Sequence, residues 1–173
     1  MSFSYETTLQ QNEDSSLMWY FMIPVPLDIA SQLKKQSKRV ICQINEGEPY
    51  HTALTPDGSG NDYVLVNKQR RNKMKIEVGD SVSISLKSDD SKYGMAVPAV
   101  FPVLCEEDPE GSSYFHKLTP GKQRTLLHLM GKPKSEHKQL EKALIIFDYL
   151  KSVEGALDFK ELNFAFKESR FKL

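Results

Sequence analysis

The sequence lacks the residue patterns of the common enzyme, metal and cofactor sites. Its cysteines, Cys42 and Cys105, stand too far apart for a zinc or redox motif, and its four histidines show no metal-ligand spacing. No glycine-rich stretch matches a phosphate loop or a dinucleotide-binding pattern, and no Gly-x-Ser-x-Gly nucleophile motif is present. The sequence therefore predicts no catalytic residue, no bound metal and no cofactor.

Long apolar runs are missing as well. The longest uncharged apolar stretch, residues 17–27, contains two prolines and is too short to span a bilayer. Residues 1–6 have neither the basic region nor the apolar core of a signal peptide. Cys42 falls on the apolar face of a predicted strand, so we expect both cysteines to remain free thiols, as in a reducing compartment. These absences predict a cytoplasmic protein without a membrane partner.

The sequence has no net charge, because 23 Lys and Arg balance 23 Asp and Glu. The charges are unevenly spread: residues 1–113 hold 11 basic and 16 acidic side chains, whereas residues 114–173 hold 12 and 7. This asymmetry indicates two parts with different surfaces. The overall neutrality argues against a protein that binds nucleic acid through bulk charge.

What the sequence does contain is a series of short strands before residue 88. Ser81–Leu86 alternates serine with apolar residues, which is the pattern of a strand with one buried face. Residues 39–45 alternate in the same way, and Asn45–Gly47 predicts a short turn in which Gly47 takes a positive φ. The predicted strands are residues 3–9, 17–25, 39–45, 50–54, 62–66 and 81–86.

Two short helices are predicted among the strands. Asp28 is expected to cap a helix over residues 29–36, and Asn67 is expected to cap a helix that runs to Met74. The second helix is rich in Lys and Arg and has little apolar surface. We therefore expect it to lie outside the sheet as a crossover.

Helical periodicity replaces the alternation after Pro98. The predicted helices are residues 98–104, 109–117, 120–131 and 135–153, followed by a short helix capped by Asp158. The residues predicted to face inward in the longest helix are Leu140, Ala143, Leu144, Phe147 and Leu150. The chain is therefore predicted to have two domains, residues 1–97 and residues 98–173.

Two sets of residues resemble known bacterial families. The stretch from Trp19 to Pro26, together with Arg39-Val40 and Gly79 to Val82, resembles a β-barrel domain family that has no assigned function. Phe115 to Arg124, followed by Lys134-Ser135, resembles the YdeI/OmpD-associated family, known as bacteriocin-protection proteins. Together the two resemblances cover nearly the whole chain.

The resemblances imply an α+β fold, with a small six-stranded β-barrel, split or closed, followed by a C-terminal helical region. The implied barrel is related in shape to the barrels of AbrB/MazE-type transcription factors, although a shared barrel does not imply a shared activity. The resemblance of the tail implies a role in resistance to a bacteriocin. It carries no catalytic residue over to this chain.

One basic cluster in the helical region is the candidate site. Thr119 and Pro120 begin a helix whose free N–H groups and dipole favour an anion, yet Lys122 and Arg124 place cations at that end. These cations need a compensating anion, either an internal one such as Asp108 or an external ligand. Alternatively, they form only a solvated helix face. The candidate anion-binding residues are Lys122, Arg124, His128, Lys134 and Lys138.

The sequence leaves three functions open. The first is a non-enzymatic binding module whose basic helical region contacts an anionic partner, which is a protein, a small anion or a nucleic acid. The second is a DNA-binding regulator similar to the AbrB/MazE type, although the sequence shows no pattern of a DNA-recognition helix. The third is a small-molecule enzyme with a site between barrel and helices, where Tyr20, His51 and Arg124 are conceivable polar groups.

Overall fold

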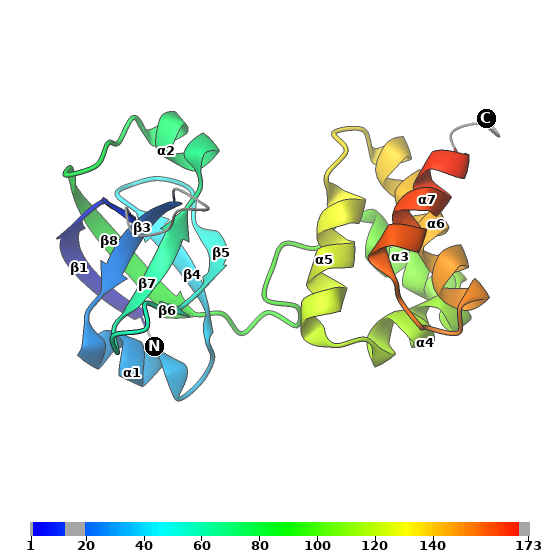
Figure 1. The fold of residues 1–173 in the computed structure, drawn as a ribbon, viewed down its shortest axis with the longest axis horizontal. Coiled ribbons are helices and arrows are strands. Elements are labelled where there is room, and N and C mark those ends of the chain that lie inside the picture. The colour runs from blue at the N-terminus through cyan, green and yellow to red at the C-terminus, as the bar shows by residue number, and fades with distance from the viewer. Residues whose placement is uncertain (1, 13–19, 170–173) are drawn as a thin grey trace. The chain divides into compact units, whose positions relative to one another are not determined.

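The chain divides into two compact units, Met1–Met95 and Ala96–Leu173 (Figure 1). The computed structural model describes residues 2–12 and 20–169. Within these residues every strand belongs to the first unit, and the regular elements after residue 88 are all helices, as the change of periodicity predicted. None of the described helices is long and apolar enough to cross a membrane.

The first unit is built from two antiparallel sheets of four strands each. One sheet has the strand order β1 (Ser2–Thr8), β8 (Ser81–Ser88), β4 (Arg39–Ile44) and β5 (Tyr50–Ala53). The other has the order β2 (Gln10–Asn12), β3 (Tyr20–Val25), β7 (Asp62–Val66) and β6 (Thr55–Pro56). The helices α1 (Leu27–Lys34) and α2 (Lys68–Met74) lie at opposite ends of this unit (Figure 1).

The prediction of a six-stranded barrel is wrong, because the eight strands of the described residues form two separate sheets and neither is closed. Two chain segments change sheets midway. β1 and β2 lie on either side of Leu9, and β5 and β6 lie on either side of Leu54; both leucines are buried. Side chains keep alternating across such a corner, so the sequence pattern does not reveal that the partner strand changes.

β3 covers the part of the predicted strand that the structure describes, and it contains a proline. Leu17, Met18 and Trp19 of the prediction lie outside the described residues. We expected Pro24 to end the strand or to lie at an edge, because proline cannot donate to a ladder. β2 pairs only with Tyr20 to Met22 of β3, so the ladder on that side ends before Pro24 is reached.

The alternating strands of the first unit bury one face, as predicted. Val40, Cys42 and Ile44 of β4 are almost fully buried, and α1 covers the same core with three apolar side chains. Cys42 carries a free thiol, and burial raises its pKa to about 11. The capping of α1 differs from prediction: Pro26 occupies the N-cap position, and Asp28 lies in the first turn.

The β4–β5 turn also differs from prediction. Asn45, rather than Gly47, has the positive φ, at 50°. Gly47 is required for space, since a Cβ there would lie 3.0 Å from the carbonyl O of Ile44 and 3.1 Å from the Sδ of Met74. The missing side chain lets this turn lie directly against α2.

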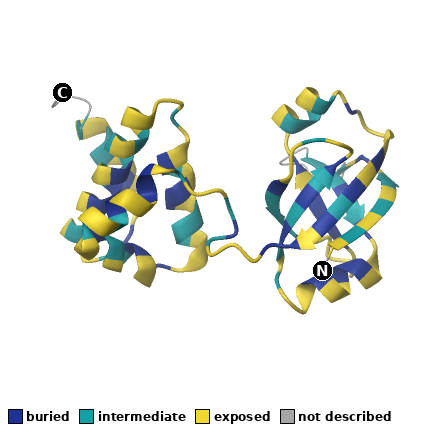
Figure 2. Cartoon of the chain, turned by 180° about the vertical axis from the view of Figure 1, so that it is seen from behind, coloured by how far each residue is buried: buried dark blue, intermediate teal, exposed yellow. Residues whose placement is uncertain are grey.

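The second unit consists of α3 (Val100–Glu107), α4 (Pro109–Lys117), α5 (Pro120–Gly131), α6 (Glu136–Ser152) and α7 (Phe159–Ser169). α6 packs against each of the other four helices. The prediction of its buried face is correct in part. Ala143, Phe147 and Leu150 are buried as predicted, but Leu140 and Leu144 are 40% and 45% exposed. Figure 2 shows the buried residues gathered on the inner sides of these helices.

The observed division of the chain removes most of the predicted charge asymmetry. Residues 1–95 hold 11 Lys and Arg against 12 Asp and Glu, whereas residues 96–173 hold 12 against 11. The acidic stretch around residues 106–110 belongs to α3 and α4, so it is part of the helical unit. Each unit is therefore nearly neutral, and the helical one is not strongly basic.

Candidate functional site

The basic cluster predicted from the sequence lies on α5, on α6 and in the loop between them. Thr119 occupies the N-cap position of α5 but makes no side-chain cap hydrogen bond. Lys122 is half-buried, and its Nζ donates to the carbonyl O of Leu157 at 3.5 Å. Two backbone N–H groups of α7 lower the pKa of Asp158, and the charge of Lys122 adds a smaller effect. The cation at this helix start is therefore compensated within the unit.

Asp108, which we considered as the internal partner, makes its contacts elsewhere. Its Oδ1 accepts a hydrogen bond from the N–H of Gly111 at 2.9 Å and caps α4. Its Oδ2 accepts a hydrogen bond from the Nζ of Lys151 at 2.7 Å, which is the main reason that the pKa of Asp108 is lowered. Asp108 therefore stabilises the α4–α6 contact and does not compensate the cations of α5.

The other residues of the predicted basic cluster are dispersed over α5, α6 and the loop between them. Arg124 and His128 lie four residues apart on α5, Lys134 lies in the loop after α5, and Lys138 lies in α6. His128, Lys134 and Lys138 are exposed. Within the part of the chain that the structure describes, no hydrogen bond or ion pair joins these four residues to one another. An anion site at these residues stays a prediction.

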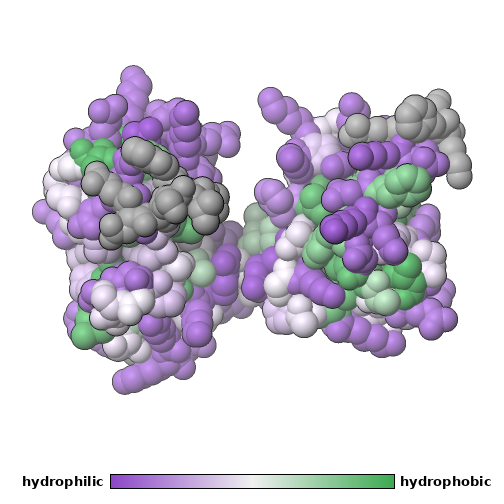
Figure 3. Space-filling model, viewed as in Figure 1, coloured by the Kyte–Doolittle hydropathy of each residue, from purple (hydrophilic) through white to green (hydrophobic). Residues whose placement is uncertain are grey.

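A second basic element, α2, was predicted only as an outer crossover, and no residue of this helix is buried. Five of the eight residues from Lys68 to Lys75 are Lys or Arg, and none is acidic. Asn67 caps the helix as predicted, since its Oδ1 accepts a hydrogen bond from the N–H of Arg70 at 2.7 Å. Figure 3 shows hydrophilic residues at the end of the first unit where α2 lies.

Two arginines attach α2 to both sheets of the first unit. The Cζ of Arg70 lies 3.7 Å from the centre of the Tyr50 ring in β5. The Cζ of Arg71 lies 4.2 Å from the centre of the Phe21 ring in β3. Such cation–π contacts orient the guanidinium plane and leave its N–H groups available for hydrogen bonds. The Nε of Arg71 is buried without a hydrogen-bond partner.

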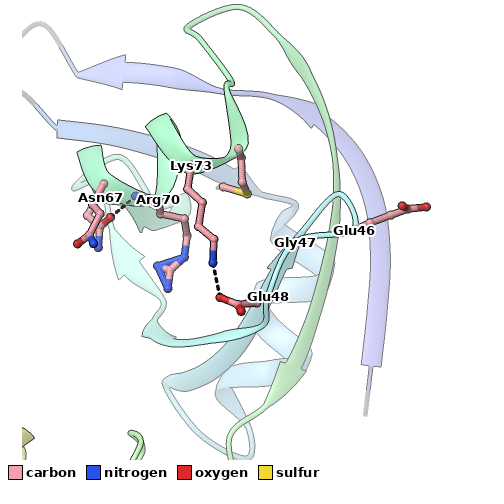
Figure 4. Close-up of a pocket in the computed structure, with 8 residues that line it drawn as sticks. Glu46, Gly47, Glu48, Asn67, Arg70 and Lys73 are labelled. Atoms are coloured by element: carbon pink, nitrogen blue, oxygen red, sulfur yellow. Dashed lines mark hydrogen bonds and ion pairs between the residues drawn. The ribbon is translucent and has the colours of Figure 1, made fainter. Parts of the chain in front are cut away.

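A cavity of about 520 Å³, here named the turn cavity, lies between α2 and the β4–β5 turn (Figure 4). Arg70 and Lys73 extend from α2 toward the turn. The Nζ of Lys73 lies 2.8 Å from the Oε2 of Glu48, and this contact lowers the pKa of Glu48. The lining residues are Glu46, Gly47, Glu48, Asn67, Gln69, Arg70, Lys73 and Met74. The turn cavity therefore holds two carboxylates as well as two cations.

A second cavity, of about 700 Å³ and here named the aromatic cavity, lies beside α2 at the β3–β7 sheet. The rings of Tyr20 and Tyr63 stack with their centres 5.6 Å apart. The hydroxyl of Tyr63 donates to that of Tyr20 at 3.3 Å, and this hydrogen bond, followed by burial, raises the pKa of Tyr63 to about 12. The lining residues are Tyr20, Phe21, Tyr63, Leu65, Val66, Asn67, Lys68 and Arg71.

The charge of the aromatic cavity distinguishes it from the turn cavity. Lys68 and Arg71 are its charged residues, and no carboxylate occurs among its described lining residues. Asn67 lines both cavities, so the two adjoin at the start of α2. We refer to α2 together with these two cavities as the α2 surface.

A third cavity, of about 300 Å³, is acidic and suits an anion poorly. Glu6, Asp57 and Asp62 are among its lining residues. Asp62 is buried, and its Oδ2 lies 2.5 Å from the Nζ of Lys34. Hydrogen bonds, chiefly from the backbone of Ser59, lower the pKa of Asp57 to about 2, which keeps this carboxylate charged.

The three polar residues of the enzyme hypothesis belong to different elements. Tyr20 lines the aromatic cavity, and Arg124 lies on α5 of the second unit. The Nδ1 of His51 lies 2.8 Å from the Oδ2 of Asp89, a buried residue whose Oδ1 accepts a hydrogen bond from the hydroxyl of Ser91 at 2.6 Å. These hydrogen bonds join β5 to the residues that directly follow β8. The enzyme hypothesis stays a prediction.

Sequence reasoning missed the aromatic cavity because its residues come from distant segments. Tyr20, Tyr63 and Arg71 lie in β3, β7 and α2, and the antiparallel pairing of β3 with β7 brings the first two together. The sequence of the 62–66 strand did contain an indication of this cavity. Tyr63 and Leu65 alternate with inward-facing valines, so they place apolar side chains on the outer face of the sheet.

Fold and surface together define an α+β protein in which a two-sheet unit with a basic outer helix precedes a helical unit. Residues 5–86 match the model of a family described as "Domain of unknown function (DUF1905)". The match includes every lining residue of the turn and aromatic cavities, and it confirms that the first part resembles a family without an assigned function. The resemblance of the tail to the YdeI/OmpD-associated family is not confirmed. No curated protein is similar enough to match the chain.

Proposed function

We propose that this chain is a non-enzymatic binding module for an anionic partner, and that the α2 surface carries the binding. The observation that supports this proposal is the pair of guanidinium groups of Arg70 and Arg71, each held over a ring of the first unit. Groups that are already oriented lose little freedom when they bind, so more of the interaction energy contributes to affinity. Planar guanidinium groups suit phosphate and carboxylate anions in particular.

The α2 surface fits an anion better than the basic cluster of the second unit. The seven residues of α2 include four cations and no acidic residue, and none of these residues is buried. On α5, the cation nearest the helix start, Lys122, already donates to the carbonyl O of Leu157. The cluster of Lys122, Arg124, His128, Lys134 and Lys138 is therefore a secondary candidate within the same proposal.

The near-zero charge of both units favours a local ligand over a long polyanion. Proteins that bind DNA through its phosphates depend on a large excess of Lys and Arg at the contact. Neither unit has such an excess, so we propose a compact anion in preference to a DNA-binding regulator. We propose bacteriocin resistance as the biological setting, and this part of the proposal rests only on the residues of the tail that resemble bacteriocin-protection proteins.

Calorimetric titration of the full chain with inorganic tripolyphosphate tests the proposal. Lys68 and Lys73 are exposed, and neither lies over a ring of the described residues. Lys68→Ala combined with Lys73→Ala therefore removes charge and keeps both arginine–ring contacts of α2, and it costs only the exposed Lys73–Glu48 ion pair, which contributes little to stability. We expect this double variant to bind at least tenfold more weakly, with an unchanged melting temperature. The matched control, Lys134→Ala with Lys138→Ala, removes two exposed cations from the second unit and is expected to bind normally.

Two outcomes would count against this proposal. An unaltered chain that fails to bind tripolyphosphate would refute anion binding as such. Weakened binding in the control variant alone would move the site from the α2 surface to the basic cluster of the second unit.

A further inference from the structure

The aromatic cavity has more apolar surface than a simple anion site needs. Tyr20, Tyr63 and Leu65 contribute to its wall, and Leu65 is 43% exposed. Phosphate alone would be satisfied by Lys68 and Arg71, and it would gain nothing from an aromatic wall. An apolar surface of this kind, bordered by polar groups, is typical of a ligand-binding site.

The aromatic wall and the cations of this cavity lie side by side. The rings belong to the β3–β7 sheet, whereas the cations belong to the adjoining helix α2. Tyr20 is held in a fixed orientation, because its ring stacks on Tyr63 and its hydroxyl accepts hydrogen bonds from Asn12 and Tyr63. Arg71 is held in the same way by the Phe21 ring. A matching ligand therefore joins a flat apolar ring to an anionic group.

We infer that the aromatic cavity binds a nucleotide, with its base against Tyr20 and Leu65 and its phosphate at Lys68 and Arg71. This inference rests on the proposed function and specifies its ligand. Aromatic side chains stack on any base, and neighbouring cations bind the phosphate; this combination is typical of nucleotide-binding surfaces on sheets. The volume of about 700 Å³ lies in the range of cavities that hold one small ligand.

A base joined to phosphate occurs both in free nucleotides and in single-stranded nucleic acid. The near-zero charge of the first unit favours a free nucleotide, since a strand would need neutralisation of many phosphates. A strand that continued past Asn67 into the turn cavity would meet Glu46 and Glu48, which oppose a second phosphate.

The test compares four ligands by calorimetric titration of the full chain: adenosine monophosphate, ribose 5-phosphate, adenosine and a short single-stranded oligoadenylate. We expect adenosine monophosphate to bind at least tenfold more tightly than either ribose 5-phosphate or adenosine. Tyr20→Leu keeps an apolar side chain but removes the ring, so it should abolish the advantage over ribose 5-phosphate. The matched control is Tyr93→Leu, because Tyr93 is also half-buried and lies beside a lysine, Lys92, but outside the cavity.

The outcomes separate the inference from the proposal on which it rests. Equal affinity for adenosine monophosphate and ribose 5-phosphate would overturn the inference and leave anion binding intact. Equal affinity for adenosine monophosphate and adenosine would overturn the placement of the phosphate at Lys68 and Arg71, and with it the inference. Binding of the oligoadenylate that depends on Tyr20, without binding of the mononucleotide, would support a nucleotide site whose source is a strand. Binding of none of the four ligands would overturn the inference, and the tripolyphosphate titration would then decide the proposed function separately.

Discussion

Gly111 marks a place where α4 and α6 come into close contact. A Cβ at this residue would lie 2.5 Å from the Cδ2 of Phe147, far closer than two carbon atoms approach without moving. Phe147 is fully buried, so its ring has little room to shift. The glycine thus serves helix packing through its missing side chain, and its conformational freedom plays no part.

We predict that Gly111→Ala lowers the free energy of unfolding by about 1–3 kcal/mol, because overpacking a dense core forces side chains and backbone out of place. Urea denaturation of the full chain measures this loss. The matched control is Gly121→Ala on α5, where an added Cβ meets no atom within 4 Å. Alanine has the higher helix propensity, so the control should be neutral or more stable by up to about 1 kcal/mol. Equal destabilisation by the two substitutions would contradict the packing argument.

The element α2 is held by its caps and by arginine–ring contacts, since none of its residues is buried. Helices of this kind open locally at a lower free energy than the sheets that they cover. Asn67 makes the side-chain cap at the start of α2, and it is also the residue at which the two cavities adjoin.

We predict that Asn67→Ala loosens α2 and leaves the sheets unchanged. Loss of an N-cap costs about 1 kcal/mol. This cost raises the equilibrium population of the open helix, and therefore the exchange rate of its amides, roughly fivefold. Hydrogen exchange read by mass spectrometry should show this change in residues 68–74 and not in β4 or β8. If exchange accelerates equally in all strands, α2 is part of the cooperative core and the expectation is wrong.

Elements with local signals could be predicted from the sequence, whereas their partners could not. α5 begins at Pro120 and ends at Gly131 as predicted, because the residues that start and stop it lie within the helix itself. The corners at Leu9 and Leu54 depend on which distant strand supplies hydrogen bonds, which the alternation of side chains does not encode. The aromatic cavity could not be predicted for the same reason. Its rings and cations become neighbours only after β3, β7 and α2 have assembled.

At the scale of the whole molecule, each unit has a hydrophobic core of its own. The core of the first unit is drawn from residues between Leu9 and Leu86. The second unit is organised around α6, with Ile146 and Phe147 fully buried. The division near residue 95 therefore separates two cores instead of cutting through one.

We predict that fragments 1–95 and 96–173 each fold without the other. Each should show a single cooperative thermal transition, as small domains with complete cores do. Circular dichroism should report mainly strands in the first fragment and helices in the second. A fragment that loses its signal gradually, without a transition, would show that its core needs the rest of the chain.

Arg70 and Arg71 are adjacent in sequence, but they stack on rings from different sheets. α2 consequently acts as a non-covalent tether, because the sheets cannot separate at this end without losing a guanidinium–ring contact. A ligand held by α2 and the sheets together binds the assembled unit and has no site on the unfolded chain. By mass action, such a ligand at a hundred times its Kd adds about 2.7 kcal/mol to the free energy of unfolding. Ligand binding and folding of the first unit are therefore coupled equilibria.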